Sequence, residues 1–255
     1  MDNVNKTLYI PLCGKAYVSR KGIILHDPRA EEIWAAEEFP LKEKSKSKWL
    51  AYYMGMRAAV FDRWLKAQME ADPDAVVLHI GCGMDSRCER VGTRGHRWFD
   101  IDFPVVIAER KRYYQEQDNY QMVSADVTDP GWLKPLPGGT AVAVMEGVSM
   151  YLSPEKLKAA LDGLAAHFDS VHLLMDCYTT FAARASKYKN PINDVGVTKV
   201  FGIDDPQVFG GFVRELEMTP ADLVDQLSGM ERKMFRTLCA GGAAKKLYRL
   251  YEYKL

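Results

Sequence analysis

Two glycines and an acid follow a short apolar segment near residue 80. Residues 75–80 read Ala-Val-Val-Leu-His-Ile, and Gly81, Gly83 and Asp85 come directly after them. Glycines at a strand-to-helix turn let the backbone approach a ligand at the carboxyl end of a parallel sheet. A dinucleotide-binding turn would need a third glycine where Ser86 stands, and Asp85 would repel a pyrophosphate. The pattern favours a cofactor with a positive charge and no phosphate, such as S-adenosylmethionine, over an ordinary tight turn.

Acidic residues follow the next three apolar segments. Asp100 and Asp102 end the second segment, about 20 residues beyond the glycines, where an acid can accept hydrogen bonds from ribose hydroxyls. Asp126 follows the third segment and Glu146 follows the fourth. Each acid alone has a simpler explanation, and Asp102 could merely cap a helix that begins near Pro104. Acids at the ends of three successive predicted strands together indicate a binding site at the mouth of a sheet.

Arg57 is a charged residue on an otherwise apolar helix face. Residues 49–69 carry apolar side chains at three- and four-residue steps, and Arg57 lies within that stripe. A buried guanidinium needs an anionic partner. The partner is either a carboxylate of the protein or the carboxylate of a ligand, held by two parallel hydrogen bonds. In the second case we expect Arg57 to be solvated while the site is empty.

The elements that would position these residues alternate between strands and helices. Short apolar runs predict strands at 75–80, 96–101, 120–124, 140–145 and 170–177. Helices fit between them, and the clearest has Ser153 as its N-cap and Pro154 in its first turn. This alternation predicts an α/β fold with a doubly wound, mostly parallel, Rossmann-like sheet.

The C-terminal part of the chain has a different pattern. A helix start at Thr219 is followed by apolar runs at 233–239 and 245–253, separated by Gly241 and Gly242. We expect these two runs to form an antiparallel hairpin, which would complete a seven-stranded sheet. Such a hairpin is typical of methyltransferases and less so of dehydrogenases.

The predicted organisation has a helical N-terminal extension, residues 1–70, that covers a cofactor-binding domain, residues 71–255. The segment 178–218 is long and has weak periodicity, which is typical of a functional lid. Its several aromatic residues argue against disorder. We therefore expect a mobile lid that lines the acceptor pocket and becomes ordered around bound ligands.

The composition excludes several classes of function. Lys and Arg together number 34, as do Asp and Glu, so no net charge favours nucleic acid or an anionic membrane. No apolar run approaches the ~20 residues of a membrane span, and the N-terminus lacks a signal-peptide pattern. Five cysteines without a Cys-x-x-Cys pair and five histidines without ligand spacing predict free thiols and no metal site. A cytoplasmic enzyme fits these features.

Four motifs resemble the leucine carboxyl methyltransferase family, which also contains bacterial O-methyltransferases of polyketide biosynthesis. They are Gly-Cys-Gly-Met-Asp-Ser-Arg at 81–87, Asp-Phe-Pro at 102–104, Ala-Asp-Val at 125–127 and Glu-Gly-Val-Ser-Met-Tyr-Leu at 146–152. The similarity runs from Thr7 to the C-terminal segment. His79 stands where general methyltransferase motifs have an acid, a departure that the family shares. The resemblance implies S-adenosylmethionine as the cofactor and S-adenosylhomocysteine as the product.

The resemblance also implies roles for single residues. Arg57 would bind the cofactor carboxylate, and Gly81 and Gly83 would form the turn beneath it. Asp102 would hold the ribose, Asp126 and Val127 the adenine, and Glu146 the methionine portion. A lysine before His26-Asp27-Pro28 contacts the cofactor in relatives, and Lys15 is the nearest candidate although its spacing differs slightly. The role of Arg87 stays open.

The acceptor is predicted from acidity. A carboxylate, with a pKa of about 4, is ionised at neutral pH, whereas a phenol, with a pKa of about 10, needs a base. No histidine–carboxylate pair is evident at the sheet mouth, which favours a carboxylate of a small metabolite or peptide and a methyl ester as product. Tyr151 and the lid aromatics are expected to line this site. Three alternatives stay open: methylation of a phenolic or other hydroxyl of a polyketide-like metabolite, an inactive cofactor-binding protein and, least favoured, an NAD-type oxidoreductase.

Overall fold

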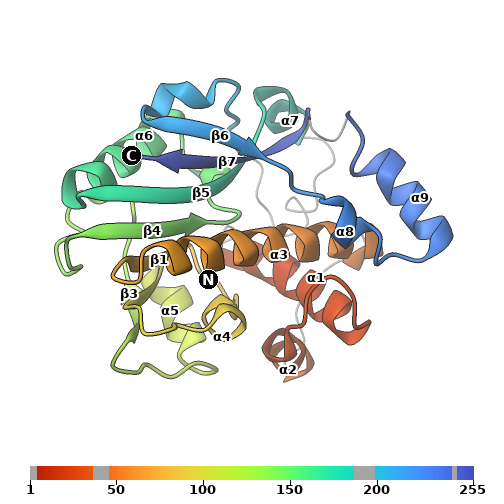
Figure 1. Cartoon of the computed structure of the whole chain (residues 1–255), viewed down its shortest axis with the longest axis horizontal. Coiled ribbons are helices and arrows are strands. Elements are labelled where there is room, and N and C mark those ends of the chain that lie inside the picture. The colour runs from red at the N-terminus through yellow and green to blue at the C-terminus, as the bar shows by residue number, and fades with distance from the viewer. Residues whose placement is uncertain (1–4, 37–45, 187–198, 243–245) are drawn as a thin grey trace.

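The structure is a computed structural model that describes residues 5–36, 46–186, 199–242 and 246–255. A short 3-10 segment, Asn5–Leu8, leads into three helices that precede the sheet: α1 (Tyr9–Arg20), α2 (Pro28–Ala36) and α3 (Lys48–Ala71). Helix α3 covers the predicted helix at 49–69 and packs along α1, which in turn packs against α2 (Figure 1). None of the described helices is both long and apolar enough to cross a membrane.

Seven strands form one sheet in the order β3-β2-β1-β4-β5-β7-β6. Their bounds are β1 Val76–Ile80, β2 Trp98–Asp102, β3 Tyr120–Ser124, β4 Thr140–Met145, β5 Ser170–Tyr178, β6 Phe212–Leu216 and β7 Tyr248–Lys254. Strands β1 to β5 pair in parallel, and β7 is antiparallel to β5 and β6. The expected mostly parallel, doubly wound sheet is confirmed. Because the strand order reverses between β1 and β4, a crevice for ligands is expected at their carboxyl ends.

Helices cover both faces of this sheet. Those that follow β1 are α4 (Arg87–Val91), α5 (Pro104–Arg110), α6 (Pro154–His167), α7 (Thr180–Ala185), α8 (Ala221–Val224) and α9 (Gly229–Leu238), with 3-10 segments at Ser149–Tyr151 and Pro206–Phe209. Successive residues of β1 point to opposite faces: Val77 packs in the cluster that contains α3 side chains, and Leu78 in the cluster of α6. Both faces are buried, which explains the continuous apolar runs of the inner strands.

The predicted C-terminal hairpin is wrong in its first strand. Residues 233–239, expected as a strand, form most of helix α9, in which Phe235 is buried and Met234 and Leu238 are exposed. A short apolar run is compatible with a strand or with a helix. Here the segment is a helix that packs on the protein with one side only. The outer neighbour of β7 in the sheet is β6, which the sequence pattern did not indicate because most of its residues are exposed and show no apolar alternation.

This correction also shortens the predicted lid. Within the segment 178–218, residues 180–185 form α7 and residues 212–216 form β6, which belongs to the sheet. The stretch 187–198 lies outside the described residues. A mobile lid therefore stays a prediction for the part of the segment before β6.

Candidate cofactor-binding site

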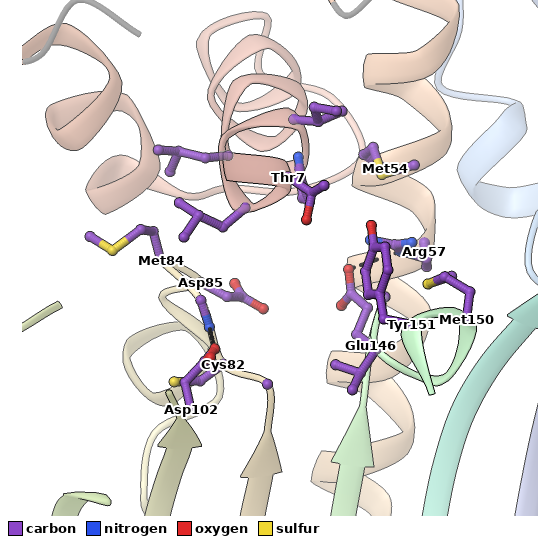
Figure 2. A pocket seen from close by; sticks show the side chains of 18 of the residues that line it. Thr7, Met54, Arg57, Cys82, Met84, Asp85, Asp102, Glu146, Met150 and Tyr151 are labelled. Atoms are coloured by element: carbon purple, nitrogen blue, oxygen red, sulfur yellow. Dashed lines mark hydrogen bonds and ion pairs between the residues drawn. The ribbon is translucent and has the colours of Figure 1, made fainter. Parts of the chain in front are cut away.

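A pocket of about 780 Å³ opens at the carboxyl ends of the central parallel strands, beneath helices α1 and α3 (Figure 2). The loops after β1 to β4 supply one side of it, and the two helices supply the other. Every residue that the sequence assigned to the cofactor lines this pocket, as does Tyr151: Lys15, Arg57, Gly81, Gly83, Asp102, Asp126, Val127 and Glu146. Its size is within the ~300–1,000 Å³ of small-molecule sites.

The loop after β1 requires its glycines. Gly81 has a φ of +67°, and a Cβ there would lie 2.2 Å from Cγ2 of Val148. Gly83 has a φ of +52°, and its amide donates a 2.8 Å hydrogen bond to Asp102. Side chains rarely adopt this left-handed region, which favours glycine at both positions, and at Gly81 a side chain would also clash with the loop after β4.

The structure separates the two acids of β2. Asp102 lines the pocket, and its two oxygens accept hydrogen bonds from the amides of Gly83 and Phe103, both at 2.8 Å. Burial raises the pKa of Asp102. Asp100 lies two residues deeper in the strand, is fully buried and forms an ion pair with Arg110. Asp100 is thus a structural acid, and Asp102 is the acid available to a ligand.

Asp126 and Val127 belong to the loop after β3. The Asp126 carboxylate accepts hydrogen bonds from the amide and the hydroxyl of Thr128, at 2.9 and 2.8 Å, and this turn keeps the loop against the pocket. Asp126 is exposed and Val127 is half-buried. Each can therefore reach a ligand without a change in the core.

Arg57 is paired with two carboxylates of the protein. Its Nε donates to Glu146 at 2.9 Å, and its Nη1 lies 3.1 Å from Asp176 and donates to the Tyr248 hydroxyl at 2.8 Å. Arg57 is 4% exposed, so the expectation that it is solvated in the empty site is wrong. Asp176 and Tyr248 hold Nη1, and these contacts fix the orientation of the guanidinium at the edge of the pocket.

Lys15 lies on α1, directly above the glycine turn. Its ammonium nitrogen is 2.9 Å from Oδ2 of Asp85 and 3.8 Å from Oε1 of Glu146, and its side chain is 3% exposed. The slight difference in spacing that weakened its assignment from sequence does not keep it from the pocket. The structure brings Lys15, Arg57 and Glu146 together.

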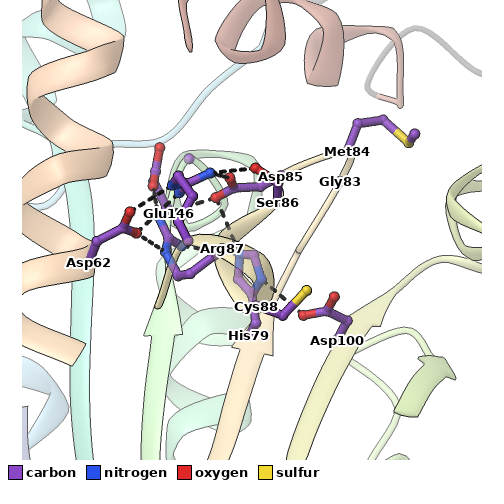
Figure 3. A network of polar contacts seen from close by, with 12 residues as sticks. Asp62, His79, Gly83, Met84, Asp85, Ser86, Arg87, Cys88, Asp100 and Glu146 are labelled. Carbon is purple, nitrogen blue, oxygen red and sulfur yellow. Dashed lines mark hydrogen bonds and ion pairs between the residues drawn. The ribbon is translucent and has the colours of Figure 1, made fainter. Parts of the chain in front are cut away.

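Arg87 is the centre of a buried polar network (Figure 3). Its guanidinium donates to Asp62 of α3 at 2.8 Å and to Glu146, and it lies 3.2 Å from Asp85. It also contacts Nε2 of His79 at 3.1 Å. Since arginine can only donate, Nε2 of His79 must accept, and its proton is on Nδ1, which faces Asp100. His79 is therefore neutral and has both nitrogens engaged, and burial lowers its pKa.

A second arginine ties the same network to the helices. Arg90 is 2.7 Å from both Asp62 and Asp27 and 2.6 Å from Asp85. Burial opposes the charge of the acids, but the surrounding cations prevail: the pKa of Asp85 is lowered by Arg90, and the pKa of Glu146 is lowered to about 2 by Lys15 and Arg57. Both carboxylates are ionised at neutral pH.

Sequence reasoning missed four members of this site: Asp62, Arg90, Asp176 and Tyr248. Asp176 had a signal, because it is a lone acid in the apolar run of β5. Asp62 and Arg90 lie on helix faces where charged residues are common, and Tyr248 is one of several tyrosines in β7. Only their spatial neighbours distinguish them.

Beside Arg57 and Glu146 the pocket wall is aromatic and apolar (Figure 2). Tyr53, Met54, Met150 and Tyr151 line it from α3 and from the 3-10 segment after β4. Burial raises the pKa of Tyr151 to about 12, so its phenol stays protonated at neutral pH and can donate a hydrogen bond. The pocket thus has a charged half at the glycine turn and an aromatic half beside it.

Comparisons with known proteins identify the family of this chain. The family model of leucine carboxyl methyltransferase matches residues 11–165, more than half of the chain. The tetracenomycin polyketide synthesis O-methyltransferase TcmP of Streptomyces glaucescens is 30% identical over 210 residues, which cover 81% of this chain and 78% of the relative. The S-adenosyl-L-methionine-dependent methyltransferase dpfgK of Gibberella zeae is 27% identical over 181 residues, 65% of this chain and 61% of the relative.

Solved structures show the same fold at low identity. A DUF574 family protein from Streptomyces avermitilis has a TM-score of 0.58 at 12% identity, over 94% of this chain and 96% of its own. Magnesium protoporphyrin IX methyltransferase from Synechocystis, crystallised with S-adenosylhomocysteine, has a TM-score of 0.50 at 14% identity, over 97% and 98% of the two chains. The chain belongs to the leucine carboxyl methyltransferase family and is an S-adenosylmethionine-dependent methyltransferase.

Proposed function

We propose that this methyltransferase transfers the methyl group to a carboxylate of a small metabolite or peptide and so forms a methyl ester. S-adenosylmethionine, when bound, would supply an electrophilic methyl group to the acceptor carboxylate and would leave as S-adenosylhomocysteine. The protein must align the acceptor oxygen, the methyl carbon and the sulfur, and such positioning can supply most of the rate. The observation that carries this proposal is the pocket with a charged and an aromatic half.

The charged half suits the cofactor. Lys15 and Arg57 can bind its carboxylate, and Glu146 its methionine portion. The ribose hydroxyls can donate to the remaining lone pairs of Asp102, and the adenine fits beside Asp126 and Val127. This order follows the strands across the mouth of the sheet: Glu146 follows β4, the glycine turn follows β1, Asp102 ends β2, and Asp126 and Val127 follow β3.

The side chains of the pocket that could act as a base support an acceptor that is already ionised. The histidine in the pocket wall, His79, has both ring nitrogens engaged by Asp100 and Arg87. Tyr151, with a pKa of about 12, is a hydrogen-bond donor at neutral pH and a poor base. A carboxylate acceptor needs neither of them as a base, whereas a phenol would have to lose its proton first.

The relative at 30% identity favours a second candidate, O-methylation of a hydroxyl of a polyketide-like metabolite. The tyrosine-lined end of the pocket would accept a flat aromatic acceptor of either kind. The two candidates differ in how the rate depends on pH and in the bond that is formed, and a single set of measurements separates them.

We expect the rate with a carboxylic acid acceptor to be constant from about pH 6 to pH 9, because the acceptor is ionised throughout. With the matching phenol the rate should rise about tenfold per pH unit below its pKa of about 10. The measurement pairs aromatic acids with phenols of the same ring system and detects methyl gain by mass spectrometry. Mild alkali cleaves a methyl ester and leaves an aryl ether intact. Alkali-stable products alone would refute the ester, and cofactor binding without methyl gain on any acceptor would favour the inactive alternative.

The assignment of the adenine loop has its own test. Asp126→Ala should lower the affinity for S-adenosylhomocysteine about tenfold or more, because a hydrogen bond to a charged group is lost. The melt without ligand should stay within about 0.5 kcal/mol of wild type, since Asp126 is exposed. Asp129→Ala is the matched control, because Asp129 is also exposed, also closes a turn through its side chain, and is not part of the pocket wall. Equal affinities for the two variants would remove Asp126 from the site.

A further inference from the structure

Two carboxylates of the pocket wall share one arginine. Nη2 of Arg87 donates to Oε2 of Glu146 and lies 3.2 Å from Oδ2 of Asp85, and the two acidic side chains are 4% and 8% exposed. Figure 2 shows both carboxylates directed into the pocket. Arg87 itself is fully buried and does not line the pocket. Arg87 therefore holds the two acids from the protein interior, and both carboxylates face the pocket.

Asp85 retains binding capacity. Its Oδ2 is a buried oxygen that lies 2.9 Å from Nζ of Lys15 and 3.2 Å from Nη2 of Arg87, but neither of these ion pairs has the geometry of a hydrogen bond. A buried carboxylate oxygen that is compensated by charge alone keeps a lone pair for a ligand N–H group.

An ammonium group already lies between the two acids. Nζ of Lys15 is 2.9 Å from Asp85 and 3.8 Å from Glu146. The position of Lys15 thus shows that a primary ammonium fits next to this pair of carboxylates. The cofactor brings a group of the same chemistry, the α-ammonium of its amino-acid portion.

We propose that Asp85 and Glu146 together bind the α-ammonium of the cofactor and that Arg87 is the positioning residue that holds the two acids in register. This inference rests on the proposed cofactor site and extends it to Asp85 and Arg87. When the cofactor binds, its ammonium replaces that of Lys15, which then pairs with the cofactor carboxylate beside Arg57. No atom of Arg87 needs to contact the cofactor.

The charges of the pocket support this exchange. Two carboxylates that contact the same guanidinium nitrogen repel each other. Without nearby cations one of them would take up a proton. Arg87 contacts both acids, and Arg90 lies 2.6 Å from the other oxygen of Asp85, so both acids stay charged. Lys15, Arg57, Asp85 and Glu146 form a neutral set in the pocket wall. A zwitterion that inserts its carboxylate among the cations and its ammonium among the acids leaves no charge unpaired.

The test compares ligands that differ only in the amino-acid portion. The probes are S-adenosylhomocysteine, its analogue without the amino group, and 5′-methylthioadenosine, which lacks the amino-acid group altogether. Asp85→Asn should weaken binding of S-adenosylhomocysteine about tenfold or more and leave the deaminated analogue and methylthioadenosine within about twofold. Asp62→Asn is the matched control, because Asp62 pairs with the same two arginines but is not part of the pocket wall.

If Asp85→Asn does not fold, the pair Arg87→Lys and Arg90→Lys makes the same comparison. Arg87 contacts Glu146 and Arg90 does not, so selectivity for the amino-bearing ligand should fall in Arg87→Lys and persist in Arg90→Lys. An equal loss for all three ligands, or the same loss of selectivity in the control variants, would show that Asp85 and Arg87 only support the fold. A wild-type protein that binds none of the probes would instead overturn the cofactor site itself.

Discussion

Arg57→Met is expected to lower the free energy of unfolding by about 3–5 kcal/mol and to abolish detectable binding of S-adenosylhomocysteine. The stability effect follows from the two acids that Arg57 neutralises: Glu146 at 2.9 Å and Asp176 at 3.1 Å, with exposures of 4% and 0%. Without the guanidinium both carboxylates remain buried with less compensation. Binding fails because the ligand carboxylate loses the two parallel hydrogen bonds from the guanidinium.

Two measurements and one control separate these effects. Denaturant melts give the stability, and the shift of the melt with ligand gives the affinity of the folded fraction. Arg63→Met is the matched control, because Arg63 is on the same helix but is 52% exposed and pairs with an exposed acid, Asp222. Arg57→Lys should retain more stability than Arg57→Met and still bind ligand weakly, because lysine keeps the charge but not the fork. A destabilised Arg57→Met that keeps wild-type affinity would show that Arg57 serves the fold alone.

Asp100→Asn is expected to destabilise the protein by about 3–5 kcal/mol, whereas Asp102→Asn should mainly weaken cofactor binding. Asp100 is fully buried, pairs with Arg110, and accepts hydrogen bonds from Trp98 at 2.8 Å and from Tyr120 at 2.6 Å. Despite burial, Arg110 and His79 hold its pKa below its ordinary value. An amide leaves the Arg110 charge uncompensated in the core.

The two substitutions control for each other, since they make the same chemical change two residues apart in one strand. In melts without ligand, Asp100→Asn should be the less stable variant. In titrations with S-adenosylhomocysteine, Asp102→Asn should be the weaker binder. The stabilising effect of the Asp100 carboxylate is present above the ordinary pKa of Asp and is lost as the pH falls toward the lowered pKa of the folded state. The melts should therefore converge in strong acid. Equal stability of the two variants at neutral pH would contradict the structural role of Asp100.

Much of the site could be predicted because it is local. A buried parallel strand has a continuous apolar run, and its last residue reaches the same edge as the last residue of its neighbours. The positions of Asp102, Asp126 and Glu146 at one pocket follow from that geometry once the strands are recognised. The glycine turn is equally local, because the positive φ of Gly81 depends on only a few residues. The family motifs are composed of the same short segments.

Other features depend on contacts between distant segments. Asp100 and Asp102 share a face of β2, and only their depth in the packed core makes one structural and leaves the other to the ligand. The edge strand β6 has few buried residues, so its place in the sheet comes from pairing with β7 and not from an apolar pattern. Helix α9 likewise depends on tertiary packing, because Phe235 is its one buried residue and anchors one side of the helix to the protein.

The sequence by itself therefore determined the sheet of the inner strands, the glycine turn, the acids at the strand ends and the need of Arg57 for an anion. The tertiary structure decided which anion Arg57 has, since its partner Glu146 is 89 residues away along the chain. It also decided that Arg87 joins Asp62, Asp85 and Glu146 from three elements. Charges in a low-dielectric interior select partners by distance in space, and the sequence pattern of one element contains no record of that distance.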